Sequence, residues 1–469
     1  MKIFNFQFSI FKASKKGSIL IYTVVIIFIL GMVMLGLLSY AAMELRVTRS
    51  TVYREQAFQV AEAGVNYYEW HLANFPTDFW DGNASTTPGP YVHNYADPET
   101  GVVIGKFSLT ITPPTVGSTV VIVQSSGWTL AAPNNDRTVT VRYGIPSLAQ
   151  YAFLANGDIW IGPTENVSGQ FFANGGIRFD GTGNAPIMSA KQTYTCDDWQ
   201  GSPCPYSENG IWGAAPQSTQ NFWQYPVPNT DFSAITANLS SMKTLAQSGG
   251  RYLAPSNKQG YSLVFQSNGT VDVYVVTSLA GGEPQGMDTN RVNHDESTDY
   301  NNRTFLYNVA IPANGIIYIE DNAWVEGTVK GRVMVAVAQL PYNSSTAPEL
   351  YIPSNLVYLA KDGTNSLGLI GQQDVIVTYN SPNNLEIDAA LIAQNGAAQR
   401  WYYNGNTKNS ITIYGSIASN GTWTWSWNEP VNSGYVNTYT TYDSNLLYAP
   451  PPSFPLSSSG YQQISWNSN

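Results

Sequence analysis

Charged residues are scarce in this sequence. Asp, Glu, Lys and Arg make up 12% of the 469 residues, whereas 43% are hydrophobic and 13% are aromatic. This supply of aromatic side chains excludes an intrinsically disordered chain, which has too few of them to form a core. Walker, dinucleotide-binding, HExxH and GxSxG motifs are also absent. The sequence therefore carries none of these common signatures of nucleotide-binding or hydrolytic enzymes.

The few charges are unevenly distributed along the chain. Residues 1–54 hold seven of the 22 basic residues and one of the 32 acidic residues, which leaves residues 55–469 with 15 basic and 31 acidic residues, a balance of -16. A body this acidic lacks the positive surface that binds phosphate backbones, so nucleic acid is excluded as a partner. The basic, apolar head indicates attachment to a membrane instead.

The head contains one long uncharged stretch. Residues 17–43, 27 in all, carry no charge, and a helix of that length, at about 1.5 Å per residue, exceeds the ~30 Å hydrocarbon core of a membrane. Lys12, Lys15 and Lys16 precede it, which favours the cytoplasm for that side. The stretch is too long for an ordinary secretory signal. We expect a single-pass cytoplasmic membrane protein with a short cytoplasmic leader and an extracytoplasmic body.

Two motifs in the head carry a family resemblance. Lys15-Lys16-Gly17 directly precedes the apolar stretch, and residues 56–64 read QAFQVAEAG. Over about residues 10–75 they resemble the type IV prepilin signal and the QAF…AEAG signature of PilX-type minor pilins. The resemblance implies that a prepilin peptidase cleaves after Gly17 and that the new amino terminus, Ser18, is methylated. It also implies that the helix assembles with other pilins or pilus machinery into a type IV pilus or pseudopilus.

The expected assembly helix departs from that family at one position. Most major pilins carry Glu at the fifth mature position, where this chain has Tyr22. An unpaired carboxylate in a membrane is costly and therefore marks a partner. The absence of Glu favours a tip or priming subunit, or a subunit that stays in the membrane. The residues expected to contribute to assembly are Tyr22, Glu44, Phe58, Glu62 and Gly64.

Beyond Pro76 the pattern changes to β-strands. Residues 105–113 and 137–143 alternate apolar and polar side chains, and residues 119–124 are a further strand-like run, which predicts an antiparallel meander. A long helix packed on such a sheet resembles the pilin architecture.

A short motif recurs further along the chain. It consists of an apolar residue, a small residue, Asn or Gln, and Gly, followed by a second short strand. From Leu154 to Phe172 the spacing is 18 residues, and from Ile370 to Ile392 and on to Ile417 it is 22 and 25. This repeat predicts a β-solenoid like a parallel β-helix, in which Asn side chains bond along the stack. Because Asn-Gly is also a common hairpin turn, a β-sandwich ectodomain is the alternative.

A different segment separates the two repeat blocks. Residues 231–246 have helical spacing of apolar residues, and residues 261–276 read as a hairpin across Asn268-Gly269. The predicted fold is therefore mainly β with a long amino-terminal helix. The expected division is residues 1–17 (leader), 18–75 (transmembrane and assembly helix), 76–146 (pilin-like antiparallel sheet), 147–190 and 313–445 (β-solenoid domain), 191–312 (inserted αβ segment) and 446–469 (extended, proline-stiffened strap).

Two weak candidate sites lie in the inserted segment. Cys196 and Cys204 could form a short-range disulfide outside the cytosol, or remain as free thiols in a loop. Oxygen-bearing side chains, the type that Ca²⁺ prefers, cluster within residues 288–299, although their spacing does not match an EF-hand. A solvated loop is the favoured interpretation of that cluster. The calcium candidates are Asp288, Asn290 and Asp295.

One candidate ligand site lies near the end of the second repeat block. Residues 422–427 read TWTWSW, which on a strand would place Trp423, Trp425 and Trp427 on one face. An exposed aromatic face could stack on a surface glycan or a partner protein. The alternative is a packed solenoid face or cap.

The sequence as a whole favours a minor pilin-like cell-surface protein with a structural or adhesive role. No cofactor and no catalytic residue is predicted, since no carboxylate pair recurs on one face of the repeat in the way that a glycosidase needs. Two alternatives remain: a single-pass surface anchor or adhesin outside any pilus, and a membrane-tethered carbohydrate-active enzyme.

Overall fold

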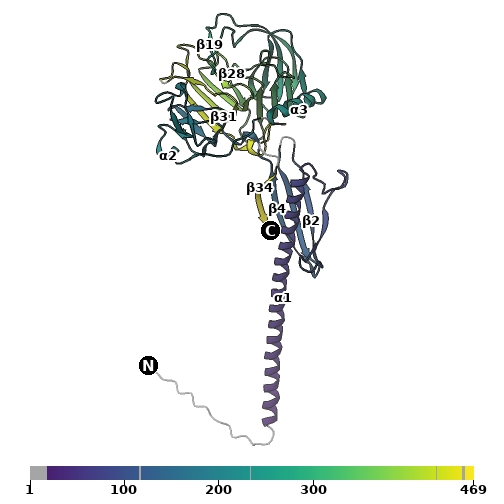
Figure 1. Ribbon diagram of the computed structural model, residues 1–469. Coiled ribbons are helices and arrows are strands. Elements are labelled where there is room, and N and C mark those ends of the chain that lie inside the picture. The colour runs from purple at the N-terminus through teal and green to yellow at the C-terminus, as the bar shows by residue number, and fades with distance from the viewer. Residues whose placement is uncertain (1–17, 116–117, 233, 429, 457–459, 469) are drawn as a thin grey trace, which may run out of the picture.

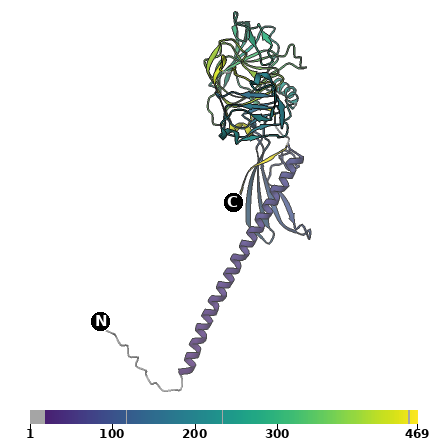
Figure 2. The same ribbon diagram turned by 60° about the vertical axis from the view of Figure 1, so that its left-hand side comes forward.

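The computed structural model describes residues 18–115, 118–232, 234–428, 430–456 and 460–468. It is mainly β with a long amino-terminal helix, as predicted. Figures 1 and 2 show a solenoid domain beyond one end of a small sheet, and the free part of the helix extending in the opposite direction.

Helix α1 (Ser18–Asn74) runs without a break for 57 residues, or about 85 Å. Its carboxy-terminal part packs on an antiparallel sheet, and the helix ends two residues before Pro76, which disfavours helical geometry at the residue before it. The buried core between helix and sheet includes Val60, Tyr68, Leu109 and Val123. The strands, in spatial order, are β1 (Tyr91–Ala96), β2 (Val103–Thr112), β3 (Val121–Thr129), β4 (Ala132–Gly144) and β34 (Gln462–Ser468).

The solenoid is built mainly from parallel strands that stack coil upon coil, most of them in a 22-stranded sheet and three in a separate 3-stranded sheet. This confirms the predicted β-solenoid over the β-sandwich. Successive coils stack in three columns of parallel strands. The first column contains, in order along the stack, β16 (Arg251–Leu253), β22 (Ile316–Ile319), β24 (Arg332–Val337), β27 (Ser366–Gly371), the ends of β29 (Asn384–Ala393) and β31 (Thr407–Ser419), β5 (Phe153–Ala155), β8 (Phe171–Ala173), β11 (Ile187–Ser189) and β15 (Trp223–Gln224). The second contains β17 (Gly260–Gln266), β23 (Ala323–Val329), β25 (Leu350–Ile352), β28 (Val375–Val377) and β30 (Ala398–Gln399), and the separate ladder of β6 (Ile159–Ile161), β9 (Ile177–Phe179) and β14 (Ile211–Trp212). The third contains the end of β23, β26 (Leu356–Tyr358), the beginnings of β29 and β31, β33 (Ser433–Tyr442), β7 (Glu165–Ser168) and β10 (Thr182–Gly183).

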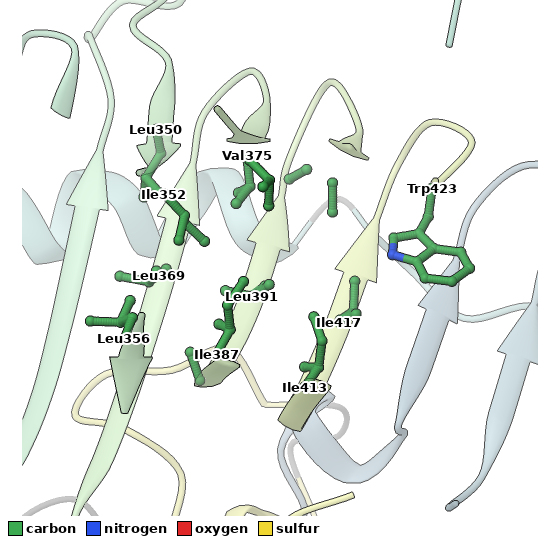
Figure 3. Close-up of a cluster of buried hydrophobic side chains, with 14 of the residues drawn as sticks. Leu350, Ile352, Leu356, Leu369, Val375, Ile387, Leu391, Ile413, Ile417 and Trp423 are labelled. Atoms are coloured by element: carbon green, nitrogen blue, oxygen red, sulfur yellow. The ribbon is translucent and has the colours of Figure 1, made fainter. Parts of the chain in front are cut away.

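The order of coils in space differs from their order in the chain. The last strands of the second repeat block stack directly on the first strands of the first block: Ile417 of β31 pairs with Phe153 of β5, and Thr438 of β33 pairs with Glu165 of β7. The two blocks, although separated by more than a hundred residues, therefore form one continuous stack. Columns of aliphatic side chains fill its interior, such as Leu369, Leu391 and Ile417 in successive coils (Figure 3).

Asparagine side chains bond along one edge of the stack. Asn174 Nδ2 donates to Asn156 Oδ1, and Asn156 Nδ2 donates to Asn420 Oδ1, both at 2.7 Å. One coil further, Asn395 Nδ2 donates to the carbonyl oxygen of Gln372 at 2.8 Å. These are the Asn and Gln positions of the recurring motif, so the motif marks the same turn in five coils.

The segment between the blocks runs from one end of the stack to the other. Within it, α3 (Ala234–Ser248) buries Leu239 and Met242 against the outside of the solenoid. Strand β17 does form the expected hairpin with β18 (Thr270–Leu279), but it also pairs in parallel with β23. Residues 251–266, assigned above to the insertion, thus form a coil of the solenoid.

The other elements lie outside the stacked coils. The helical ones are η1 (Leu148–Gln150), η2 (Asp198–Gln200), α2 (Gln217–Gln220) and η3 (Ser444–Leu447). The strands are β12 (Thr193–Thr195), β13 (Ser207–Asn209), β19 (Gly286–Met287), β20 (Asn293–His294), β21 (Tyr300–Ala310) and β32 (Ser426–Trp427).

Two chain segments connect the solenoid to the sheet. The first leaves β4, and the second returns after η3 to form β34. They bond to each other where Ser147 N donates to Leu447 O at 3.1 Å and Leu148 N donates to Pro455 O at 2.9 Å. The predicted carboxy-terminal strap therefore ends as a strand of the first domain, antiparallel to β4.

Candidate functional sites

The amino-terminal half of α1 has no protein around it in the isolated chain. Its large apolar side chains between Ile19 and Val47 are 48% to 81% exposed, and by length and composition this is the one helix in the described residues that could cross a membrane. Tyr22 and Glu44 both lie on this exposed part. The apolar surface covers the whole circumference of the helix, so it needs lipid or other helices as its surroundings.

The small residues of the AEAG motif contact the chain's own sheet. A Cβ atom on Gly64 would lie 2.7 Å from Cδ2 of Phe107. A Cβ atom on Gly127 of β3 would lie 2.5 Å from the carbonyl oxygen of Ala57 and 2.8 Å from Cα of Ala61. Helix and strand thus approach with almost no side chain between them. Gly64, expected to contribute to assembly, is used within the chain.

Two further residues expected to contribute to assembly, Phe58 and Glu62, lie on the carboxy-terminal half of α1. Phe58 packs edge-to-face on Trp466 of β34, with 5.8 Å between ring centroids. Glu62 remains partly exposed. The expected cleavage residue Gly17 lies outside the described residues, and Ser18 is the first residue of α1.

The residues of the calcium candidate are used in local contacts. Asp288 is buried, with Oδ1 accepting from Val292 N at 2.8 Å and Oδ2 3.2 Å from His294 Nε2. Asp295 is exposed and accepts from Gln285, and Asn290 is also exposed. Across the described parts of the chain, no three His, Cys, Asp or Glu residues are grouped to hold a metal ion.

The three tryptophans of the TWTWSW segment do not share an exposed face. Trp423 and Trp425 are buried at 3% and 0% exposure and meet edge-to-face within the solenoid core. Only Ser426 and Trp427 belong to a strand here, so the alternation assumed from the sequence does not apply. Trp423 and Trp425 instead fill the interior of a coil, and Trp427 alone of the three is partly exposed.

A cavity of about 460 Å³ lies where the two repeat blocks meet. We call it the aromatic cleft. It is lined from four separate parts of the chain: residues 160–165, Trp199, residues 287–291, and residues 422–431, of which 429 is not described. Cavities of this size bind small ligands in many proteins.

Two indole rings of the aromatic cleft are fixed by contacts behind them. Trp160 Nε1 donates to Asp180 Oδ2 at 2.8 Å, and the guanidinium of Arg178 lies 4.6 Å from the centre of the same indole. Trp427 Nε1 donates to the carbonyl oxygen of Arg400 at 2.7 Å. Because the ring nitrogens are already bonded, these rings offer a ligand their apolar surface.

A third indole is held by the disulfide loop. Cys196 and Cys204 are joined, with 5.5 Å between their Cα atoms, and Trp199 lies on η2 inside the loop that they close. Asp198 of the same loop pairs with Arg291 at 3.0 Å, which connects two of the segments that line the cleft.

Removing the disulfide should loosen this loop selectively. In a Cys196→Ser, Cys204→Ser protein, we expect faster amide hydrogen exchange across residues 197–204, since the crosslink restrains only that short loop. The stacked coils should exchange as before, because their ladders do not depend on it. Hydrogen-exchange mass spectrometry checks this, and equal exchange in both proteins would show that neighbouring contacts alone hold Trp199.

Three polar atoms of residues lining the cleft lack protein partners. Glu165 Oε2, Thr289 Oγ1 and Trp423 Nε1 are buried and make no hydrogen bond to any described residue. Buried polar groups are normally satisfied, and these three atoms are exceptions that lie beneath the surface of the cleft. Burial also raises the pKa of the Glu165 carboxyl to about 8, so that it is mostly protonated at neutral pH and able to donate.

Few features of the sequence indicate this cleft. Glu165 alternates with Val167 on the inward face of β7, and a carboxyl at an inward position is a local signal that could have been noticed. Trp160 and Trp199 have no such signal, because their proximity to Trp427 depends on how distant coils stack.

The comparisons with known proteins are sparse. No family model and no curated protein matches the chain. Similar solved structures include the competence-associated pilin ComZ from Thermus thermophilus, at 12% sequence identity and a TM-score of 0.27, with 89% of this chain and 98% of that chain covered.

Proposed function

We propose that the chain is a minor pilin-like surface protein, assembled through α1 into a type IV pilus or pseudopilus and displaying its solenoid outside the cell. The observation that supports this proposal is the division of one continuous helix into two halves. The carboxy-terminal half is seated on the chain's own sheet, and the amino-terminal half exposes apolar residues on all sides. Lipid would cover that half before assembly, and helices of other pilins would cover it afterwards.

Two features favour a minor subunit over a major, repeating pilin: the residue at the fifth mature position and the size of the solenoid. Tyr22 takes the place of the Glu that pairs with a neighbour in most major pilins, so this helix would lack that partner contact. The solenoid adds a large domain to every copy, which suits a subunit present in small number, such as one at a tip. Its role would be structural or adhesive, since Glu165 is the one carboxyl among the described residues lining the aromatic cleft, and a glycosidase needs two.

Processing at Gly17 tests the proposal. Mass spectrometry of protein recovered from the membrane and from sheared surface material should find an amino terminus at Ser18, carrying a methyl group. A Gly17→Leu variant should retain its first 17 residues and be missing from the sheared material, while a Gly281→Ala variant, changed in an exposed loop of the body, should be processed normally. An intact leader on the wild-type surface protein would contradict the proposal and favour a simple membrane anchor.

A further inference from the structure

We propose that the aromatic cleft is a binding site for a neutral carbohydrate chain, which stacks on Trp160 and Trp427 and forms hydrogen bonds with hydroxyl groups of Thr164, Thr422 and Ser426. This would deepen the adhesive part of the proposed function, on which it rests, by giving the displayed solenoid a ligand class.

The aromatic surfaces are the first argument for a sugar. The electron-rich face of an indole attracts the slightly positive C–H groups that line one side of a pyranose ring. Trp160 is held in place by Asp180 and Arg178, and Trp427 by the carbonyl of Arg400. These contacts exist without ligand, so little side-chain freedom would be lost on binding.

The polar lining is the second argument. A sugar carries both hydrogen-bond donors and acceptors, and hydroxyl groups, which can act as either, belong to the lining residues Thr164, Thr422 and Ser426. Hydrogen bonds to polar groups placed in this way fix the orientation of a ligand in a pocket and give it specificity.

Charge argues for a neutral ligand. The single cation among the described lining residues, Arg291, is already paired with Asp198. The body carries a net negative charge, which repels anionic chains such as sulfated glycans. A peptide would be expected to use exposed backbone edges or charged anchors, and the lining provides mainly hydroxyl groups and indole faces.

The test measures binding of neutral hexasaccharides to the full chain purified in detergent. The probes are hexamers of β-1,4-glucose, β-1,3-glucose, α-1,4-glucose and β-1,4-N-acetylglucosamine, with tryptophan fluorescence and calorimetry as readouts. At least one hexamer should bind the wild-type protein. Trp160→Ala and Trp427→Ala should each weaken its binding by about tenfold or more, whereas Trp160→Phe, which keeps an aromatic face, should retain more of it.

Controls separate a lost site from a lost fold. Trp70→Ala removes an exposed indole on α1, a helix that contributes no residue to the lining of the cleft. This variant should bind the hexamer as the wild-type protein does. Circular dichroism and the thermal midpoint should match between Trp160→Ala and Trp160→Phe. The proposal is overturned if no neutral hexamer binds, if binding is unchanged in both alanine variants, or if a proline-rich peptide or heparin competes for the same tryptophans. Each of these results would leave processing at Gly17 unaffected, so the two proposals fail separately.

Discussion

Replacing Gly127 by alanine is expected to destabilise the amino-terminal domain by about 3 kcal/mol or more, at the upper end of what overpacking costs. The added methyl group would lie 2.5 Å from the carbonyl oxygen of Ala57 and 2.8 Å from Cα of Ala61. Both are backbone atoms in the middle of α1, so neither can turn aside as a side chain would. The helix must move away from β3, and the core around Val60 and Tyr68 loosens with it.

Calorimetry of the full chain in detergent, with limited proteolysis of the sheet domain, measures this effect. Gly281→Ala is the matched control, since its added Cβ meets no heavy atom within 4 Å, and surface changes of this kind stay within about 0.5 kcal/mol. An unchanged unfolding temperature for the sheet domain of Gly127→Ala would show that helix and sheet tolerate a wider separation. It would also reopen an intersubunit role for the AEAG residues.

The solenoid was predictable because its signal is local and repeated. The turn motif places Asn156, Asn174, Asn395 and Asn420 at equivalent positions, and their side chains do bond along the stack. Each coil carries the same motif, so every further occurrence of the motif in the sequence strengthens the prediction of a solenoid. The helix was predictable for a similar reason, since a continuous apolar stretch allows few other structures.

The order of the coils was not predictable from the same motif. A repeat tells which residues occupy equivalent positions, but it does not tell which coil lies on which. The pairing of Ile417 with Phe153 joins segments 264 residues apart, and nothing in either segment specifies the other. Residues 251–266 were assigned to the insertion for a similar reason. A strand of a coil and a strand of a hairpin show the same alternation of apolar and polar side chains, so the pattern does not distinguish them.

The site was predictable only in part, for a related reason. The TWTWSW segment does line the aromatic cleft, but the strand alternation assumed there put the wrong tryptophans on the surface. Trp423 and Trp425 fill the coil interior, and the partly exposed Trp427 lines the cleft together with Trp160 from the other repeat block. Because the cleft forms between coils that are distant in sequence, its lining cannot be predicted unless the order of the coils is known.

Glu165→Gln should make the solenoid more stable than the wild type at pH 8 and similar to it at pH 4.5. The carboxyl has a pKa of about 8 in the folded protein, raised by burial from an ordinary value near 4.5. The unfolded chain therefore loses this proton at lower pH than the folded chain does. Stability from the group is fully present below pH 4.5 and is lost as pH rises to about 8.

The expected difference is on the order of 4 kcal/mol, because each unit of pKa shift corresponds to about 1.4 kcal/mol. Glutamine has a similar shape and does not ionise, so its protein should lose none of this stability. Urea unfolding of both proteins at pH 4.5, 6 and 8 measures the difference, with Glu99→Gln, at an exposed position of the sheet domain, as the control. Parallel pH profiles for wild type and Glu165→Gln would mean that the carboxyl ionises freely in the folded state. Water reaching Oε2 from the cleft would then be the physical reason.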